Sequence, residues 1–503
     1  MKSKLVTALW LCGAGILLTL SFAPFNIWPL AVLSPSVLFY FWMNDNKKEA
    51  FFHGLYFGLG FFSSGTYWTY IALHQYGGMP ITLSVLLSIL VIIFLSAFIG
   101  ANGLLNLVVS GAQSRRKSAI LIYPGTWVLF EWIRSHVFFN GFPWLLVGYS
   151  QTDSVLNSLS PIIGVFGLSL VTILMAASFS TLARQFRPKL AIKIGAMIVL
   201  LFSMAFALKG ISYTQNKNQI RVALVQGNVQ QTVKWNPSQL PFTLKRYYDI
   251  TNKIKQKTLI VWPEGAVATF PQLVPNFIIS TQNMLKRTSS RLLFGTELYN
   301  KAKNEYYNGM VFLGGNRVDY HKQRLVPFGE YYPLQFISKP MLHFLNLPSD
   351  GYTPGQPHQP LMQFNNTKIA TFICYEIAYP SLVLKESKTK NLIVVISDDS
   401  WFGKSIALPQ QLQISKMRAL ETGRYVLACN NTGITAIINP KGQIISQAPP
   451  QQVHLLQNTV TSIAGETPLM ITGYAPTWFA SLILTLIGVN DFSSRQERRS
   501  NKR

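Results

Sequence analysis

Long apolar segments, separated by short polar loops, dominate the first 210 residues of the chain. Seven of these segments approach the roughly 20 apolar residues that a membrane-spanning helix needs, and an eighth lies close to the C-terminus. The pattern therefore predicts a helical membrane domain and, after a long interval, one more spanning helix. The predicted spans are residues 5–22, 27–43, 51–72, 82–109, 119–135, 161–183, 190–209 and 469–489.

Residues 211–468 follow a different pattern, in which short β-rich runs alternate with helical stretches. Several runs are continuously apolar, which is typical of strands that are buried on both faces. Strands and helices that alternate in this way predict one large α/β domain of buried sheets flanked by helices. The expected strands are residues 220–226, 258–262, 291–296, 310–314, 369–374, 392–397, 426–430 and 435–438, and the expected helices include 238–257, 274–290 and 408–423.

The composition supports a membrane protein. Of the 503 residues, 49% are hydrophobic and only 13% are charged, whereas about a quarter is usual for a soluble domain. The net charge of +25 comes without any nucleic-acid-binding motif, so we expect no nucleic acid partner. Three cysteines without a CxxC spacing indicate neither a disulfide framework nor a zinc site. We therefore expect no metal.

The basic residues near the apolar segments occur in alternate loops and predict the orientation of the chain. The loops around residues 22–27, 73–81 and 136–160 contain no Lys or Arg. Because cytoplasmic loops carry the excess of Lys and Arg, we expect both termini in the cytoplasm and residues 211–468 outside it. The basic loop residues are Lys2, Lys4, Lys47, Lys48, Arg115, Arg116, Lys117, Arg184, Arg187 and Lys189, and five more lie in the tail at residues 495–503.

Three polar residues follow strand-like runs, where α/β folds place groups that face a ligand. Glu264 follows Leu-Ile-Val-Trp-Pro, Lys322 follows Tyr-His, and Cys374 follows Ile-Ala-Thr-Phe-Ile. A carboxylate here could act as a base, a lysine could stabilise an oxyanion, and a cysteine could be a nucleophile. Taken singly, each has a simpler explanation: a turn carboxylate, a solvated surface lysine and a buried structural cysteine.

The three residues together resemble the nitrilase superfamily, in which Glu, Lys and Cys follow one another in this order. The motifs that carry the resemblance are WPE, K-x-x-LVPFGE and CYE. Further motifs resemble the apolipoprotein N-acyltransferases over essentially the whole chain. These are ALVQGNVQQTVKWN, PFGEYYP, SDDSWFG, SFAPFN and GFPWLLVGYSQ.

The resemblance implies a polytopic α-helical membrane domain joined to an α-β-β-α sandwich. The expected organisation is a seven-helix membrane domain at residues 1–210, a catalytic domain at 211–468, an eighth spanning helix at 469–489 and a basic cytoplasmic tail at 490–503. The family also implies the bacterial cytoplasmic (inner) membrane, with the catalytic domain on the periplasmic side. We expect a monomer without cofactors.

The resemblance also implies a two-step acyl transfer, the last step of lipoprotein maturation. Cys374 would take a fatty acyl chain from a membrane phospholipid as a thioester. The N-terminal α-amine of a diacylated apolipoprotein would then accept it. A free thiol has a pKa of about 8.5, so it needs activation, for which Glu264 is the expected base. Lys322 and the N–H group of Tyr375 would stabilise the thiolate and the oxyanion.

Six further residues are expected to support the reaction because they match family motifs. Glu330, Tyr375 and Glu376 would assist the catalytic residues, and Asn308, Trp235 and Trp401 would contact the substrates. For each tryptophan, ordinary packing or anchoring at the membrane interface is the alternative.

Two other classes of protein remain open from the residues alone. A membrane-tethered amidase would use the same three residues to hydrolyse a substrate, although a tether needs only one spanning helix. A transporter with an accessory domain would usually show two similar halves, and no such duplication is visible. Within the membrane region, Glu131 and Arg134 are either functional charges or a local ion pair, and we expect Cys429 to be a core residue.

Overall fold

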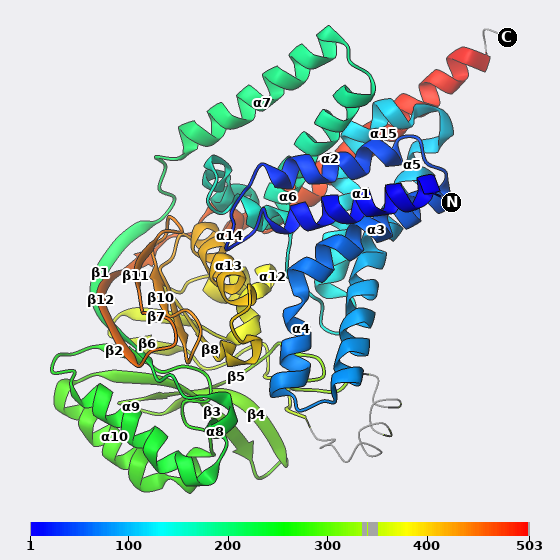
Figure 1. Ribbon diagram of the computed structural model, residues 1–503. Coiled ribbons are helices and arrows are strands. Elements are labelled where there is room, and N and C mark those ends of the chain that lie inside the picture. The colour runs from blue at the N-terminus through cyan, green and yellow to red at the C-terminus, as the bar shows by residue number, and fades with distance from the viewer. Residues whose placement is uncertain (1, 334–335, 337–339, 341–350, 501–503) are drawn as a thin grey trace. The chain divides into compact units, whose positions relative to one another are not determined.

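The computed structural model describes residues 2–333, 336, 340 and 351–500 and divides into two compact units (Figure 1). The first unit, which is helical, comprises Met1–His74, Gly78–Ile211 and Ile471–Arg503. The second comprises Ser212–Met470 with the short segment Gln75–Gly77. The C-terminal helix thus returns to the unit in which the chain begins, and Thr477 donates there to the carbonyl of Ile163 at 3.3 Å.

The helical unit fits a membrane domain. In the part of the chain that the structure describes, three segments are long and apolar enough to cross a membrane: Ile81–Ser110, Val155–Arg184 and Pro188–Leu208. Three shorter apolar helices accompany them. The principal helices are α1 (Lys2–Thr19), α2 (Leu30–Trp42), α3 (Lys47–Thr66), α4 (Trp68–Ile71), α5 (Ile81–His136), α6 (Ser160–Arg184), α7 (Pro188–Leu208) and α15 (Ala475–Ser500). The short helix α14 (Pro468–Thr472) contains the boundary between the two units.

Helices α1 and α3 pack backbone against backbone through glycines. A Cβ atom added to Gly60 would lie 2.0 Å from the carbonyl oxygen of Cys12, and one added to Gly15 would lie 2.0 Å from that of Phe57. Small residues at such crossings are typical of membrane helices, where close packing replaces the hydrophobic effect. Cys12 lies within this contact and donates its thiol to the carbonyl of Tyr56 at 3.1 Å.

Helix α5 reverses direction within its length. The hydroxyl of Thr126 donates to the side-chain oxygen of Asn106 at 2.6 Å, although 20 residues of straight helix would separate them by about 30 Å. The rings of Phe94 and Phe138 also meet, with centroids 5.7 Å apart. The helix therefore consists of two antiparallel arms. The first contains the apolar segment Ile81–Ser110, and the span expected at residues 119–135 stays a prediction.

Glu131 and Arg134 bind the backbone of the segment that follows α5. Arg134 donates to the carbonyls of Phe142 at 2.9 Å and Trp144 at 2.6 Å. Glu131 accepts from the N–H of Val147 at 2.7 Å. Both side chains are buried, and together they hold residues 142–147 against the helix. A structural role therefore accounts for both charges.

The second unit contains two six-stranded sheets. In each sheet, three neighbouring strands are parallel: β1-β2-β3 in the first and β7-β8-β9 in the second. The first sheet has the order β12 (His454–Ala464), β1 (Gln215–Gln226), β2 (Leu259–Val261), β3 (Arg291–Asn300), β4 (Glu305–Leu313), β5 (Val318–His321). The second has the order β11 (Ile444–Gln447), β10 (Ala436–Ile438), β9 (Val426–Asn430), β8 (Leu392–Ser397), β7 (Thr367–Ile373), β6 (Met362–Phe364).

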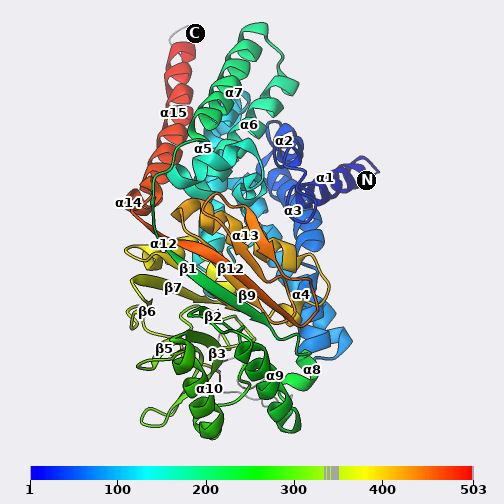
Figure 2. The same ribbon diagram turned by 90° about the vertical axis from the view of Figure 1, so that its left-hand side faces the viewer.

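The two sheets pack against each other and carry helices on their outer faces, which confirms the expected α-β-β-α sandwich (Figure 2). Residues of both sheets share the central core, among them Val261 and Ile396. A second core joins the other face of the first sheet to α9 (Leu240–Asn252) and α10 (Pro275–Thr288) through Tyr247 and Leu285. Two helices belong to the second sheet: α12 (Pro380–Ser387) and α13 (Ala407–Thr422).

Candidate active site

Glu264 lies directly beyond strand β2, on a turn that the neighbouring strand holds in place. The N–H of Trp262 donates to the carbonyl of Leu293 at 2.8 Å, and the N–H of Gly295 donates to that of Pro263 at 3.2 Å. Beyond Glu264 the chain turns at Gly265, whose φ of +58° favours glycine. The turn presents the Glu264 carboxylate at the carboxyl edge of the parallel strands.

Lys322 follows strand β5, and its ammonium group lies between two carboxylates. It donates to Glu330 at 2.7 Å and lies 3.6 Å from the nearer oxygen of Glu264. The side chain is only 1% exposed. Burial alone lowers the pKa of this lysine, but the charges of Glu330 and Glu264 raise it by more, so its net pKa exceeds the ordinary value. Lys322 is therefore a permanent buried cation.

Cys374 occupies the first position after strand β7 and begins a 3₁₀ helix, Cys374–Ala378. Its φ of +52° is uncommon for a residue with a side chain and marks a sharp turn. Such strained positions cluster at active sites. Burial raises the pKa of the thiol well above its ordinary value, Glu264 raises it further, and Lys322 opposes the shift. The resting sulfur is therefore a protonated thiol within the electrostatic reach of both side chains.

Asn308 connects the two carboxylates around Lys322. Its side-chain amide donates to Glu264 and to Glu330, each at 2.7 Å, and its carbonyl accepts from the N–H of Lys322 at 2.9 Å. Glu330 also accepts from the N–H of Val326 at 2.7 Å. The structure thus gives Asn308 and Glu330 partners that position Glu264 and Lys322.

Glu376 is fully buried beneath the turn that carries Cys374. It accepts from the N–H groups of Ile373 at 2.7 Å and Gln323 at 2.6 Å, and from the hydroxyl of Tyr320 at 3.0 Å. Burial raises the pKa of this carboxyl to about 7, although the Ile373 N–H opposes the shift. Glu376 therefore ties the end of β7 to the segment after Lys322, so the positions of Cys374 and Lys322 are fixed together.

Of the remaining aromatic candidates, the two tryptophans are exposed, whereas Tyr375 is half-buried. Trp235 is 45% exposed and Trp401 is 39% exposed. The ring of Tyr375 packs edge-on against Tyr379, with centroids 5.3 Å apart. Their exposure leaves both tryptophans available for contact with a substrate. Packing against Tyr76, in the case of Trp401, and anchoring at the membrane interface remain the alternative roles.

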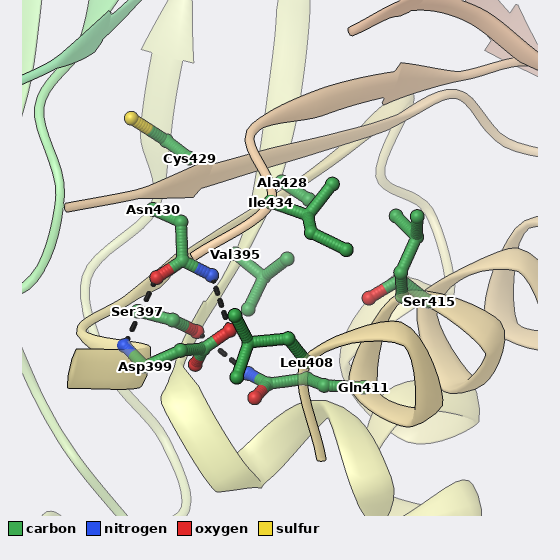
Figure 3. Close-up of a pocket in the computed structure, with 11 residues that line it drawn as sticks. Val395, Ser397, Asp399, Leu408, Gln411, Ser415, Ala428, Cys429, Asn430 and Ile434 are labelled. Carbon is green, nitrogen blue, oxygen red and sulfur yellow. Dashed lines mark hydrogen bonds between the residues drawn. The ribbon is translucent and has the colours of Figure 1, made fainter. Parts of the chain in front are cut away.

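Sequence reasoning missed a group of buried polar residues behind the site. A small cavity lies beside Asp399 and Asn430, which exchange two hydrogen bonds, and beside Ser397, which accepts from Gln411 at 2.8 Å (Figure 3). Cys374 is not among the residues that line this cavity. The cavity therefore belongs to the framework behind the reaction site. The signal that could have pointed to it is the pair of aspartates in SDDSWFG, directly after a buried strand.

Asp399 makes the stability of this framework depend on pH. Burial raises the pKa of its carboxyl to about 8, against the hydrogen bond from Asn430. The folded chain therefore retains this proton up to about pH 8, whereas the unfolded chain releases it near the ordinary value of 3.8. Stability declines wherever the unfolded state binds fewer protons than the folded one, so this group lowers stability as the pH rises from about 4 to about 8.

We expect Asp399→Asn to remove that decline, because the amide has no proton to release over this range. Unfolding temperatures of the variant and the parent are measured in detergent at pH 5.5 and pH 8.5. The unfolding temperature of the variant, relative to that of the parent, should be higher at pH 8.5 than at pH 5.5. Asp249→Asn, at an exposed ion pair with Lys245, is the control. A difference for Asp399→Asn that stays constant with pH would contradict the expectation.

Comparisons with known proteins cover almost the whole chain. The model of the apolipoprotein N-acyltransferase N-terminal domain matches residues 14–178, and that of carbon-nitrogen hydrolase matches residues 221–467. The chain is 38% identical to an apolipoprotein N-acyltransferase of Coxiella burnetii over 475 residues, 94% of this chain and 98% of that protein.

A second relative, from Azotobacter vinelandii, is also an apolipoprotein N-acyltransferase and is 36% identical over 497 residues, 97% of this chain and 95% of that protein. Among solved structures, Saccharomyces cerevisiae Nit3, a member of branch 10 of the nitrilase superfamily, matches with 15% identity and a TM-score of 0.39. This match covers 50% of this chain and 93% of that one.

Proposed function

Because this chain belongs to the apolipoprotein N-acyltransferase family, we propose that it transfers a fatty acyl chain from a membrane phospholipid to a lipoprotein through a thioester on Cys374. The acceptor is the N-terminal α-amine of a diacylglyceryl-cysteine. The observation that carries the proposal is the arrangement of the candidate triad, Glu264, Lys322 and Cys374. A buried cation and a carboxylate both act on one thiol at a strained turn.

The first step forms the thioester. Since the Cys374 thiol is protonated at rest, its proton must leave as the sulfur attacks the ester carbonyl, and Glu264 accepts it. The lysophospholipid oxygen then departs with that proton, so Glu264 becomes ionised again. In the second step the lipoprotein amine attacks the thioester and Glu264 removes the amine proton. The C–S bond then breaks, and Glu264 returns this proton to the sulfur, so the thiol and the carboxylate are both restored.

Lys322 stabilises the negative charge that develops on the carbonyl oxygen in both steps. Its positive charge is secure because the neighbouring carboxylates of Glu330 and Glu264 outweigh the effect of burial on its pKa. The N–H of Tyr375 is the second donor to this oxygen. The loss of one such donor typically costs about 10²–10³ in rate, so both groups contribute substantially to the reaction.

The protein is membrane-bound, and we further propose its topology. Eight spanning helices would place both termini in the cytoplasm and the domain at residues 211–468 on the periplasmic side of the cytoplasmic membrane. The distribution of Lys and Arg between alternate loops supports this orientation. We propose that the enzyme acts as a monomer, because one chain carries all three members of the candidate triad.

The test is to follow the acyl group. Purified enzyme in detergent is incubated with phospholipid and analysed by intact-protein and peptide mass spectrometry, and a diacylated lipopeptide is then added. We expect one acyl adduct on the Cys374 peptide that disappears as the lipopeptide gains the same acyl chain. Release of free fatty acid without lipopeptide acylation would favour the amidase alternative, and absence of the adduct would overturn the proposal.

A further inference from the structure

Lys234 and Asp398 form an ion pair in the interior of the second unit. Lys234 lies in the short helix α8 (Gln231–Lys234), and Asp398 follows strand β8. The ammonium group of Lys234 contacts the carboxylate of Asp398, and the two side chains are only 4% and 3% exposed. Removing two charges from water is costly unless further hydrogen bonds satisfy them. The other hydrogen bonds of Lys234 and Asp398 therefore indicate what the ion pair does in the fold.

The ion pair reaches Glu264 from two sides. Lys234 donates from its ammonium group to the backbone carbonyl of Glu264 at 2.9 Å. The backbone N–H of Asp398 donates to the carboxylate of Glu264 at 3.1 Å. Glu264 is therefore held at its main chain by one member of the pair and at its side chain by the other.

The next residue along the chain leaves room for this contact. A Cβ atom added to Gly265 would lie 2.6 Å from the ammonium nitrogen of Lys234. Lys234 thus occupies the space beside the turn that presents Glu264, and a side chain at position 265 would displace it.

Asp398 is itself firmly held. Its other carboxylate oxygen accepts from the hydroxyl of Ser400 at 2.7 Å and from the amide of Asn431 at 3.2 Å. Asn431 also donates to the carbonyl of Val229 at 2.7 Å, in the segment that leads to Lys234. Hydrogen bonds join the ion pair to Ser400 and Asn431, so the side chains of the pair have little freedom to move. Replacing either member of the pair should therefore change the position or the charge environment of Glu264.

We propose that Lys234 and Asp398 are positioning residues that aim the Glu264 carboxylate and balance the charge beside it. The inference rests on the proposed role of Glu264 as the base. Without Lys234, the Asp398 carboxylate would stand uncompensated near Glu264, and a like charge favours the protonated form of a carboxyl. Without the Asp398 charge, the Lys234 cation would favour the ionised form.

This balance predicts opposite effects from the two halves of the pair. The measurement is the rate constant of Cys374 acylation by phospholipid, determined by mass spectrometry over a range of pH. In Lys234→Met the acid limb of the profile should move to higher pH, and the rate constant at pH 7 should fall roughly ten- to hundredfold, as expected for a displaced reacting group. In Asp398→Asn the acid limb should move to lower pH.

The double variant and a matched control complete the test. Lys234→Met combined with Asp398→Asn should return the acid limb to within a few tenths of a pH unit of the parent, because both charges are gone. Lys245→Met, which breaks the exposed pair with Asp249, should leave the profile unchanged. A purely structural role would slow the reaction without moving the limb in opposite directions, and that outcome would overturn the inference.

The parent enzyme and Glu264→Gln are measured alongside. If the parent forms no Cys374 adduct, the proposed function fails. If the parent reacts, Glu264→Gln does not, and both single variants keep the parent profile, only the positioning inference fails. Asp398→Asn keeps the number of non-hydrogen atoms and the backbone N–H that binds Glu264. The shift of its acid limb therefore decides the question if Lys234→Met does not fold.

Discussion

Replacing Cys374 by alanine should leave the protein folded and abolish the acyl adduct. The side chain is partly exposed, so its removal opens no large core cavity, and the turn remains fixed by the hydrogen bonds of Glu376. Without a sulfur no thioester can form, and the remaining groups can only bind substrate. We expect acylation of the lipopeptide to fall by about 10³-fold or more, as when other catalytic nucleophiles are removed.

The matched control is Cys429→Ala. Cys429 is 1% exposed, donates its thiol to the carbonyl of Val261 at 3.3 Å and belongs to the central core between the sheets. Burial raises the pKa of its thiol, and a deeply buried thiol cannot reach a lipid ester. This variant should lose some stability but retain the Cys374 adduct. Normal turnover by Cys374→Ala, or loss of the adduct only in Cys429→Ala, would contradict the assignment.

The difference between the two cysteines shows what the sequence could predict about the site. Both follow apolar runs, but only Cys374 shares its motif pattern with Glu264 and Lys322. The motifs therefore selected the residues that the structure brings together. They could not reveal the hydrogen bonds from Gln323 and Tyr320 to Glu376 or the direction of the thiol's pKa shift, because both depend on residues far away in the chain.

The fold was predictable where strands are apolar throughout. The eight expected strands are all present, because buried parallel strands such as β8 are continuous apolar runs. The strands that were missed are short or half exposed. β12 pairs with β1 at the edge of the first sheet and is only partly buried, and β11 is mostly exposed. Their pairing partners stabilise them more than their own sequences do.

The buried charges behind the site were the hardest feature to predict. A lysine in KWN and an aspartate in SDD are usually surface residues, and 164 residues separate Lys234 from Asp398. Only the folded chain shows that they meet beneath Glu264. The sequence thus identifies the groups that would react, whereas the residues that orient those groups become visible only once the two sheets pack against each other.

Glu264→Gln should block thioester formation. The pH dependence of its residual acylation rate should identify the role of the carboxylate. Glutamine has the same shape but cannot accept the thiol proton. Its amide must also place an N–H₂ group against either the Asn308 amide or the Asp398 N–H, both of which are donors to Glu264. We expect the acylation rate constant at pH 7 to fall by about 10²–10⁴, the usual contribution of a positioned base.

The pH dependence of the residual activity separates a base from a merely structural carboxylate. Glu264 raises the pKa of the Cys374 thiol, so its replacement should lower that pKa and let alkaline solution remove the proton instead. The residual acylation rate of Glu264→Gln should therefore increase with pH, and the gap to the parent should narrow above pH 9. Glu305→Gln, at a carboxylate that binds Tyr307 in a surface hairpin, is the control. A gap that stays constant with pH would mean that Glu264 orients the site but does not carry the proton.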